Sequence, residues 1–164
     1  MNSNINSELF DLATRVGQAL KAKQLMLCTA ESCTGGGVAQ AVTEIAGSSE
    51  WFDCGFVTYS NVSKMDMLNV SNALIAQMGT VSEEVAGAMA EGALANSSAD
   101  VALATTGIAG PTGAVPGKPV GTVCFAWSKG DHTHPERLVF QGDRASVRAQ
   151  TVKHSLQGLL RFIE

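Results

Sequence analysis

Aromatic and basic side chains are scarce in this sequence of 164 residues. Aromatic residues make up 5% of the chain, so its core must be built from Ala, Val, Leu, Ile and Met. That scarcity argues against a stacking platform for single-stranded nucleic acid. The net charge of −4 argues against a surface for nucleic acid or for an anionic membrane. We therefore expect no nucleic-acid or membrane partner.

Long apolar runs and paired cysteines are also missing. No apolar run approaches the ~20 residues that a membrane span needs. Residues 1–8 are polar and lack a signal-peptide pattern, so we expect a cytoplasmic protein. The cysteines form no C-x-x-C pair, which favours buried free thiols over a zinc site or a disulfide framework. They are Cys28, Cys33, Cys54 and Cys124.

Helical and strand-like patterns alternate along the chain and predict one domain over residues 1–164. The predicted class is α/β, a three-layer α/β/α sandwich around a mixed sheet with a late β-hairpin. The predicted helices cover 7–23, 34–46, 62–68, 72–78, 83–95 and 144–162. The predicted strands cover 25–29, 51–59, 100–106, 120–128 and 134–141.

The most informative stretch is 29–37, with the sequence TAESCTGGG. A short apolar strand precedes it and a helix follows, an arrangement that α/β proteins use for anion sites. Glycines let backbone N–H groups approach a ligand, and a helix N-terminus adds about half a positive charge. Ser32 is then either a nucleophile, with an oxyanion hole formed by N–H groups of Thr34, Gly35 and Gly36, or only a helix N-cap.

Polar residues follow three of the predicted strands. Ser32 follows the first, Tyr59, Asn61 and Lys64 follow the second, and Thr106 follows the third. Ligands bind beyond the carboxyl ends of strands in open α/β sheets, so we expect these residues to converge. A lysine whose pKa is lowered by burial can activate a serine, with Tyr59 as a proton relay or as a group that orients the lysine. The alternative is that Lys64 is a solvated helix residue.

Other side chains offer weaker candidates for a base or a nucleophile. His132 and His134 belong to the predicted hairpin and His154 lies well inside the last helix, so a Ser–His–Asp triad lacks an obvious base. Cys33 adjoins Ser32 and is a competing nucleophile, with packing as its other role.

A second glycine loop, TGIAGP, covers residues 106–111. Gly107 and Gly110 let its N–H groups form an anion-binding nest. The loop matches neither a Walker A motif nor G-x-G-x-x-G, and the alternative is a tight turn packed on the sheet.

Arg144 and Arg148 lie one helical turn apart at the start of the last predicted helix. Two guanidinium groups beside a helix N-terminus suit a phosphate or a carboxylate. The alternative is a solvated surface or an ion pair with Asp143.

Taken together, these motifs resemble the C-terminal domain family of the competence/damage-inducible protein CinA. Stand-alone members of that family are nicotinamide-nucleotide amidohydrolases, the PncC proteins or NMN deamidases. The matching stretches occur in family order over nearly the whole chain. They are 29–36, 47–49, 57–61 with Lys64, 79–82, 106–111, 118–123 and 142–144.

The resemblance implies hydrolytic deamidation of nicotinamide mononucleotide to nicotinic acid mononucleotide and ammonia, in pyridine nucleotide salvage. It implies a cytoplasmic homodimer that uses a Ser–Lys mechanism without a metal or another cofactor. Carried over by position, the resemblance implies that Ser32 is the nucleophile, Lys64 its base and Tyr59 the proton relay. It also implies that Ser49 and Thr106 supply hydroxyl groups to the pocket and that Arg144 binds an anion. Arg148 joins the site on helical spacing alone.

The chain departs from the family pattern at Ala114 and Val115, where we expect two glycines. That departure bears on substrate preference more than on the chemistry. Two alternatives from other classes stay open. One is a non-catalytic nucleotide-binding relative that keeps the glycine loops and Arg144 but needs no special lysine, and the other is an oligomeric scaffold whose glycine turns are incidental.

Overall fold

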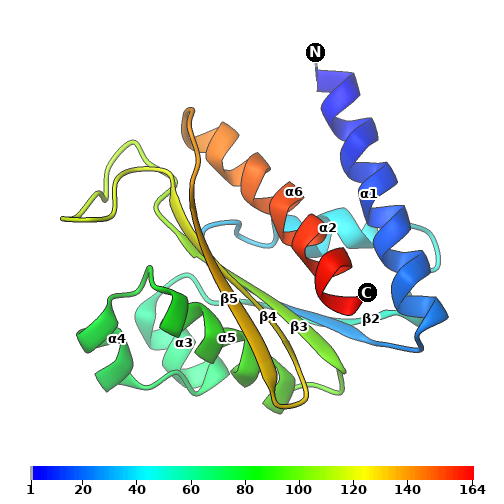
Figure 1. Cartoon of the computed structure of the whole chain (residues 1–164), viewed down its shortest axis with the longest axis horizontal. Helices are drawn as coiled ribbons and strands as arrows, with labels where there is room; N and C mark the ends of the chain where they lie inside the picture. The colour runs from blue at the N-terminus through cyan, green and yellow to red at the C-terminus, as the bar shows by residue number, and fades with distance from the viewer. Residues whose placement is uncertain (1) are drawn as a thin grey trace.

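A five-stranded mixed sheet lies between two layers of helices in the computed structural model, which describes residues 2–164 (Figure 1). The strands are β1 Leu27–Glu31, β2 Phe52–Val57, β3 Val101–Gly107, β4 Thr122–Lys129 and β5 His132–Val139. The helices are α1 Asn2–Ala22, α2 Gly37–Thr43, the 3-10 turn η1 Ser48–Glu50, α3 Asn61–Leu68, α4 Asn72–Met78, α5 Glu83–Ala95 and α6 Arg144–Ile163. None of the helices in this part of the chain is long and apolar enough to cross a membrane.

The strand order is β2-β1-β3-β4-β5, with β2, β1 and β3 parallel, β4 antiparallel to β3, and β5 antiparallel to β4. This topology confirms the predicted mixed sheet with a late hairpin. Glu31 pairs with Val57 on one side and with Thr105 on the other, so the three parallel strands end level with one another. The segments that follow them therefore gather at one edge of the sheet.

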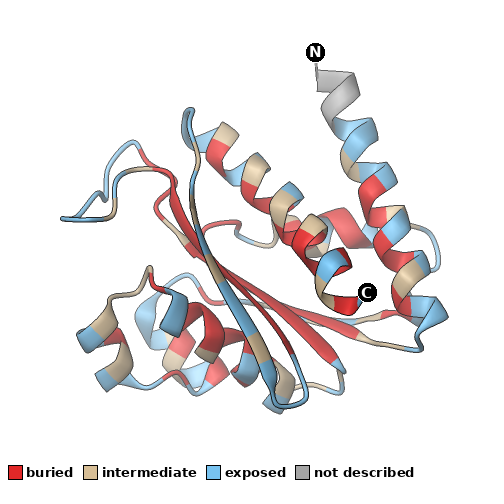
Figure 2. Cartoon of the chain, in the orientation of Figure 1, coloured by how far each residue is buried: buried red, intermediate tan, exposed pale blue. Residues whose placement is uncertain are grey.

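Each face of the sheet has its own apolar core. The face covered by α1, α2 and α6 carries large side chains such as Phe125 and Trp127. The face covered by α3, α4 and α5 carries small ones, among them Ala30 and Ala104. Figure 2 shows buried residues along the central strands and on the helix faces turned toward them, whereas β5 is largely exposed. The edge position of β5 explains its alternating pattern.

Most predicted elements are present, and α4 and α5 have their predicted bounds. Ser71 and Ser82 cap them by accepting hydrogen bonds from Leu74 N and Val85 N, which is why those boundaries are legible in the sequence. The other elements differ from their predicted bounds by one to five residues, and three of these differences are at the start of the chain. The first helix begins at Asn2 rather than residue 7, β1 lies two residues later than predicted, and α2 begins at Gly37 rather than residue 34.

Helix α5 packs closely against α3 because Gly92 has no side chain. A Cβ atom at Gly92 would lie 1.9 Å from the backbone oxygen of Leu68, the last residue of α3. Backbone cannot move aside as a side chain can, so this contact fixes the distance between the two helices.

We expect Gly92→Ala to lower the free energy of unfolding by about 3 kcal/mol, the upper end of the usual cost of overpacking. Urea unfolding followed by circular dichroism measures this. Gly87→Ala is the matched control on the same helix, since its Cβ would approach nothing closer than the Thr133 methyl group at 3.7 Å. Because alanine favours a helix, the control should be neutral or about 1 kcal/mol more stable. Equal stability of the two variants would contradict the close approach.

Candidate active site

Ser32 and Lys64 are in direct contact. The Lys64 Nζ atom lies 3.0 Å from Ser32 Oγ and donates a hydrogen bond to the Thr58 carbonyl oxygen at 2.6 Å. Helix α3 begins just beyond the end of β2, where Ser60 caps it, so its first turn places Lys64 at the shared edge of the sheet. Lys64 is 0% exposed, which excludes the solvated alternative.

Burial sets the protonation of this lysine. Desolvation lowers the pKa of Lys64 from 10.5 to about 8. None of the ion pairs in the described chain involves Lys64, so no carboxylate offsets that effect. Near neutral pH a part of the population therefore holds a neutral amine against the Ser32 hydroxyl.

Two consecutive turns carry the chain from Ser32 into α2. Gly35 N donates to the Ser32 carbonyl at 3.0 Å, and Gly37 N donates to the Thr34 carbonyl at 2.9 Å. Gly35 and Gly36 have φ angles of 59° and 96°, the pair of positive values that a type I′ turn requires. The left-handed pair delays the helix to Gly37 and makes Gly36 its N-cap, so Ser32 is not a capping residue.

The N-terminus of α2 is already occupied by a carboxylate of the protein. Glu31 is fully buried and accepts from Val38 N at 2.8 Å, from Ala39 N at 3.0 Å and from Thr34 Oγ1 at 2.6 Å. The expectation that this helix end faces a ligand is therefore wrong. Sequence reasoning missed Glu31, and the one available signal was an acidic residue shortly before a helix.

The three predicted oxyanion donors are not equivalent. The Gly35 N–H is used inside the turn, where it donates to the Ser32 carbonyl. The N–H groups of Thr34 and Gly36 have no acceptor within the described residues. Thr34 and Gly36 thus keep a donor for a ligand, whereas the role of Gly35 is conformational.

A cavity of about 240 Å³ opens beside the serine. Residues that follow all three parallel strands meet in it, as the topology predicts. Its lining consists of Ser32, Cys33, Tyr59, Thr80, Val81, Thr106, Gly107, Ala109 and Arg144.

Arg144 reaches this cavity from the start of α6. It donates to the Gly110 carbonyl at 2.9 Å and to the Tyr59 hydroxyl at 3.1 Å. The predicted alternative of an ion pair with Asp143 does not hold, since that carboxylate caps α6 by accepting from Ser146 N. Tyr59 is 63% exposed, and its hydroxyl accepts a hydrogen bond from Arg144. Because Ser32 and Lys64 are in direct contact, a proton relay through Tyr59 is unnecessary.

Thr106 and Asn61 hold the segment that closes one side of the cavity. Thr106 Oγ1 donates to the Thr80 carbonyl at 3.0 Å, and Asn61 Oδ1 accepts from Thr80 Oγ1 at 2.8 Å. Thr106 also lines the cavity, whereas Asn61 does not. These contacts give both residues a positioning role on the 79–82 segment.

Two further predicted site residues, Arg148 and Ser49, are also absent from the lining of the cavity. Arg148 donates from Nε to the Cys33 carbonyl at 3.1 Å and from Nη2 to the Thr34 carbonyl at 3.3 Å, so its expected role as a ligand for an anion is replaced by contacts to backbone. Ser49 is exposed in η1, which precedes β2, and within one chain it lies at the opposite end of the sheet from Ser32.

The competing nucleophile, Cys33, has a thiol that stays protonated. Burial raises the pKa of the Cys33 thiol to about 12. A thiol that stays protonated near neutral pH is a poor nucleophile. Packing is therefore the role that the structure supports for Cys33.

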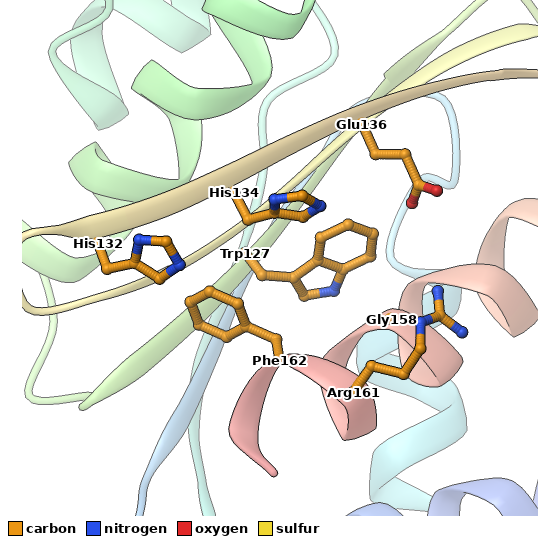
Figure 3. Close-up of a pocket in the computed structure, with 7 residues that line it drawn as sticks. All are labelled: Trp127, His132, His134, Glu136, Gly158, Arg161 and Phe162. Atoms are coloured by element: carbon orange, nitrogen blue, oxygen red, sulfur yellow. The ribbon is translucent and has the colours of Figure 1, made fainter.

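His132 and His134 belong to a different part of the molecule, and His154 pairs with Glu136 at 2.7 Å. A cavity of about 330 Å³ lies between β5 and α6, where His134 stacks on Trp127 and His132 on Phe162 (Figure 3). In the sheet register His132 pairs with Lys129, and Lys129 pairs with Val101 at the start of β3. This end of the sheet is opposite to the one that holds Ser32, so no imidazole from this cavity serves the serine.

Fold and site together define an α/β protein with a buried serine–lysine pair at the carboxyl edge of a mixed sheet. The family model described as the CinA C-terminal domain matches residues 9–163. This chain belongs to the CinA C-terminal domain family, as the sequence motifs predict.

Relatives support the same placement over nearly the whole chain. A Pseudomonas putida protein named nicotinamide-nucleotide amidohydrolase PncC is 52% identical over 151 residues, 92% of this chain and 94% of that protein. The Escherichia coli K12 protein of the same name is 51% identical over 156 residues, 94% of each chain. A crystal structure titled competence/damage inducible protein CihA, from Agrobacterium tumefaciens, superposes with a TM-score of 0.92 at 42% identity and covers 95% of this chain and 96% of that one.

The buried lysine has a consequence for stability. The pKa of Lys64 is about 8 in the folded chain against 10.5 when exposed, so between these values the unfolded chain binds more protons. Stability should then rise with pH from about 8 to 10.5. We expect Lys64→Met to abolish this part of the rise in melting temperature, measured by thermal unfolding across that range.

Lys23→Met is the matched control, because Lys23 is exposed to solvent just after the end of α1. The control should keep the pH dependence of the unsubstituted protein. Parallel pH profiles for Lys64→Met and the unsubstituted protein would contradict a deprotonated buried lysine.

Proposed function

We propose that this protein hydrolyses the carboxamide of nicotinamide mononucleotide through a serine acyl-enzyme and releases nicotinic acid mononucleotide and ammonia. The observation that carries the proposal is the 3.0 Å contact between Ser32 Oγ and the buried Lys64 Nζ. The amidohydrolase assignment is supported by PncC relatives about half identical over nearly their full length. It places the protein in pyridine nucleotide salvage.

The same contact weighs against a non-catalytic nucleotide-binding module. Such a module has use for the glycine loops and Arg144 but none for a lysine buried without a counter-charge. Burying an amine costs free energy of folding. In return the amine becomes a base near neutral pH, because desolvation lowers the pKa of Lys64 to about 8. A serine and a base in hydrogen-bond contact are the components of nucleophilic catalysis.

Acylation starts with the neutral form of Lys64. The amine takes the hydroxyl proton of Ser32, and Oγ attacks the carboxamide carbon. A tetrahedral oxyanion forms, for which the unpaired N–H groups of Thr34 and Gly36 are the available donors. The Lys64 ammonium then gives its proton to the departing nitrogen, which leaves as ammonia.

Deacylation uses the same groups in reverse. Lys64 is neutral again after ammonia leaves and accepts a proton from a water molecule. That water attacks the ester carbon, and the ammonium returns a proton to Ser32 Oγ. The acid product carries a negative charge, and its departure completes the cycle.

The size of the cavity bears on how the substrate lies. A volume of about 240 Å³ is smaller than usual for a whole ligand of nucleotide size, but it accommodates a pyridine ring. The ribosyl phosphate then extends outward, and Arg144 stands at the rim with an exposed guanidinium group. We assign the phosphate to Arg144 and the ring to the floor formed by Thr106 and Gly107.

Assembly and location complete the proposal. Val57, Tyr59 and Val62 are 46%, 63% and 62% exposed beside the catalytic edge, which suits burial in the homodimer that the family resemblance implies. A cytoplasmic location stays a prediction from the sequence.

We expect Ser32→Ala to reduce ammonia release from nicotinamide mononucleotide to background, because no acyl-enzyme forms. Lys64→Ala should lose about 10²–10⁴-fold, the usual contribution of a general base. A coupled ammonia assay measures both, with circular dichroism to show that the variants fold.

In the unsubstituted enzyme kcat/KM should rise with pH through about 8, as Lys64 becomes neutral. Full activity of Ser32→Ala would overturn the nucleophile assignment, and a rate that falls over this pH range would overturn the base.

Arg144→Ala should raise KM for nicotinamide mononucleotide by about 10–100-fold, the worth of a charge-assisted hydrogen bond to phosphate. Steady-state kinetics with nicotinamide riboside, which lacks the phosphate, should show no such change. Arg161→Ala is the matched control, because Arg161 is on the same helix but lines the distant histidine cavity. An equal loss with both substrates would contradict a phosphate contact at Arg144.

A further inference from the structure

Arg148 holds the turn that follows the proposed nucleophile. Its guanidinium group donates from Nε to the Cys33 carbonyl at 3.1 Å and from Nη2 to the Thr34 carbonyl at 3.3 Å. It comes from α6 and is absent from the lining of the cavity at Ser32. The mechanism above gives this part-buried contact no role.

Peptide geometry links the carbonyls that Arg148 holds to the N–H groups that a substrate needs. In a trans peptide the C=O of one residue and the N–H of the next point in opposite directions. The Cys33–Thr34 peptide is trans, so the N–H of Thr34 points away from the guanidinium group. This N–H has no acceptor within the residues that the structure describes.

The next peptide along shows the same relation. The Thr34 carbonyl faces Arg148, and the opposite N–H, that of Gly35, donates to the Ser32 carbonyl. Glu31 fixes the far end of the turn by accepting from Val38 N and Ala39 N. The N–H groups of Thr34 and Gly36 stay unpaired, and Thr34 N–H is the one whose peptide carbonyl, that of Cys33, is held by Arg148.

We propose that Arg148 is a positioning residue that fixes the Cys33–Thr34 peptide so that the Thr34 N–H faces the oxyanion formed on attack by Ser32. This inference rests on the proposed function and deepens it. Cys33–Thr34 is the central peptide of the turn from Ser32 to Gly35, the unit that rotates when a turn changes type. A rotated peptide presents a carbonyl oxygen to the oxyanion in place of a donor.

We expect Arg148→Met to lower kcat by about 10–100-fold with KM unchanged. The expected loss is smaller than the ~10²–10³-fold cost of deleting an oxyanion donor, because the β-branched Thr34 itself resists the positive φ that full rotation requires. Arg148→Lys keeps the charge without the planar fork and should be intermediate. Lys153→Met removes a cation one turn further along α6, where it pairs with exposed Glu8, and should keep the full rate.

Chemical rescue separates orientation from loss of fold. In Arg148→Ala, guanidinium chloride at tens of millimolar should restore part of kcat, whereas sodium chloride at the same ionic strength should not. A kcat within twofold of the unsubstituted enzyme in Arg148→Met would overturn the proposal. An increase in KM with kcat unchanged would also overturn it. The same holds for an Arg148→Ala variant that folds but recovers no kcat when guanidinium is added.

A probe that needs no amide substrate distinguishes this inference from the proposed function. A fluorophosphonate reacts with a serine as its P–F bond breaks and an Oγ–P bond forms, with fluoride leaving and the hydroxyl proton passing to Lys64. Intact mass gives the rate of labelling at Ser32, which should fall in Arg148→Met and not in Lys153→Met. Slower labelling in an enzyme that does not hydrolyse nicotinamide mononucleotide sustains the positioning role and ends the substrate proposal. Equal labelling of both variants, or no labelling of Ser32 at all, overturns the positioning role.

Discussion

Burial of Lys64 without a counter-charge is the constraint on which the rest of the site depends. An ammonium group removed from water is costly, and here the compensation consists of three oxygen atoms, Ser32 Oγ and the carbonyls of Thr58 and Tyr59. The two apolar cores must hold α3 in place against that cost. Gly92 is part of this support, because its missing side chain lets α5 pack directly on the end of α3. A contact far from the serine therefore helps to set where the base stands.

The second constraint is backbone polarity in the turn after Ser32. Side chains of opposite charge hold the two ends of this segment: Glu31 accepts from N–H groups at the start of α2, and Arg148 donates to the carbonyls of Cys33 and Thr34. Gly35 and Gly36 supply the left-handed conformation that brings the chain around between them. The turn is thus fixed by side chains outside the cavity, which leaves its unpaired N–H groups free for a substrate.

Sequence reasoning found what depends on local pattern and topology, and missed what depends on register. The caps at Ser71 and Ser82 and the gathering of residues after three strands were predictable because each follows from neighbours in the sequence. The start of α2 was not predictable, because Gly35 and Gly36 are compatible with a helix in the sequence but form a type I′ turn in the structure. Glu31 capping α2 and Arg148 reaching the serine turn depend on how β1 and α6 lie in space, which no short motif encodes.

Making a base by burial rather than by a histidine and a carboxylate has a structural consequence. His132 and His134 line a cavity away from Ser32 and His154 pairs with Glu136, so the base in contact with Ser32 is a lysine from which water is excluded. Activity and stability are then coupled through one pKa. A change that admits water to Lys64 returns its pKa toward 10.5, which stabilises the charged form and removes the base. Stability favours access of water to the charged lysine, whereas catalysis needs water to be excluded from it. The packing of α3 on α5 therefore meets opposing demands from stability and activity, and the close contact at Gly92 serves activity.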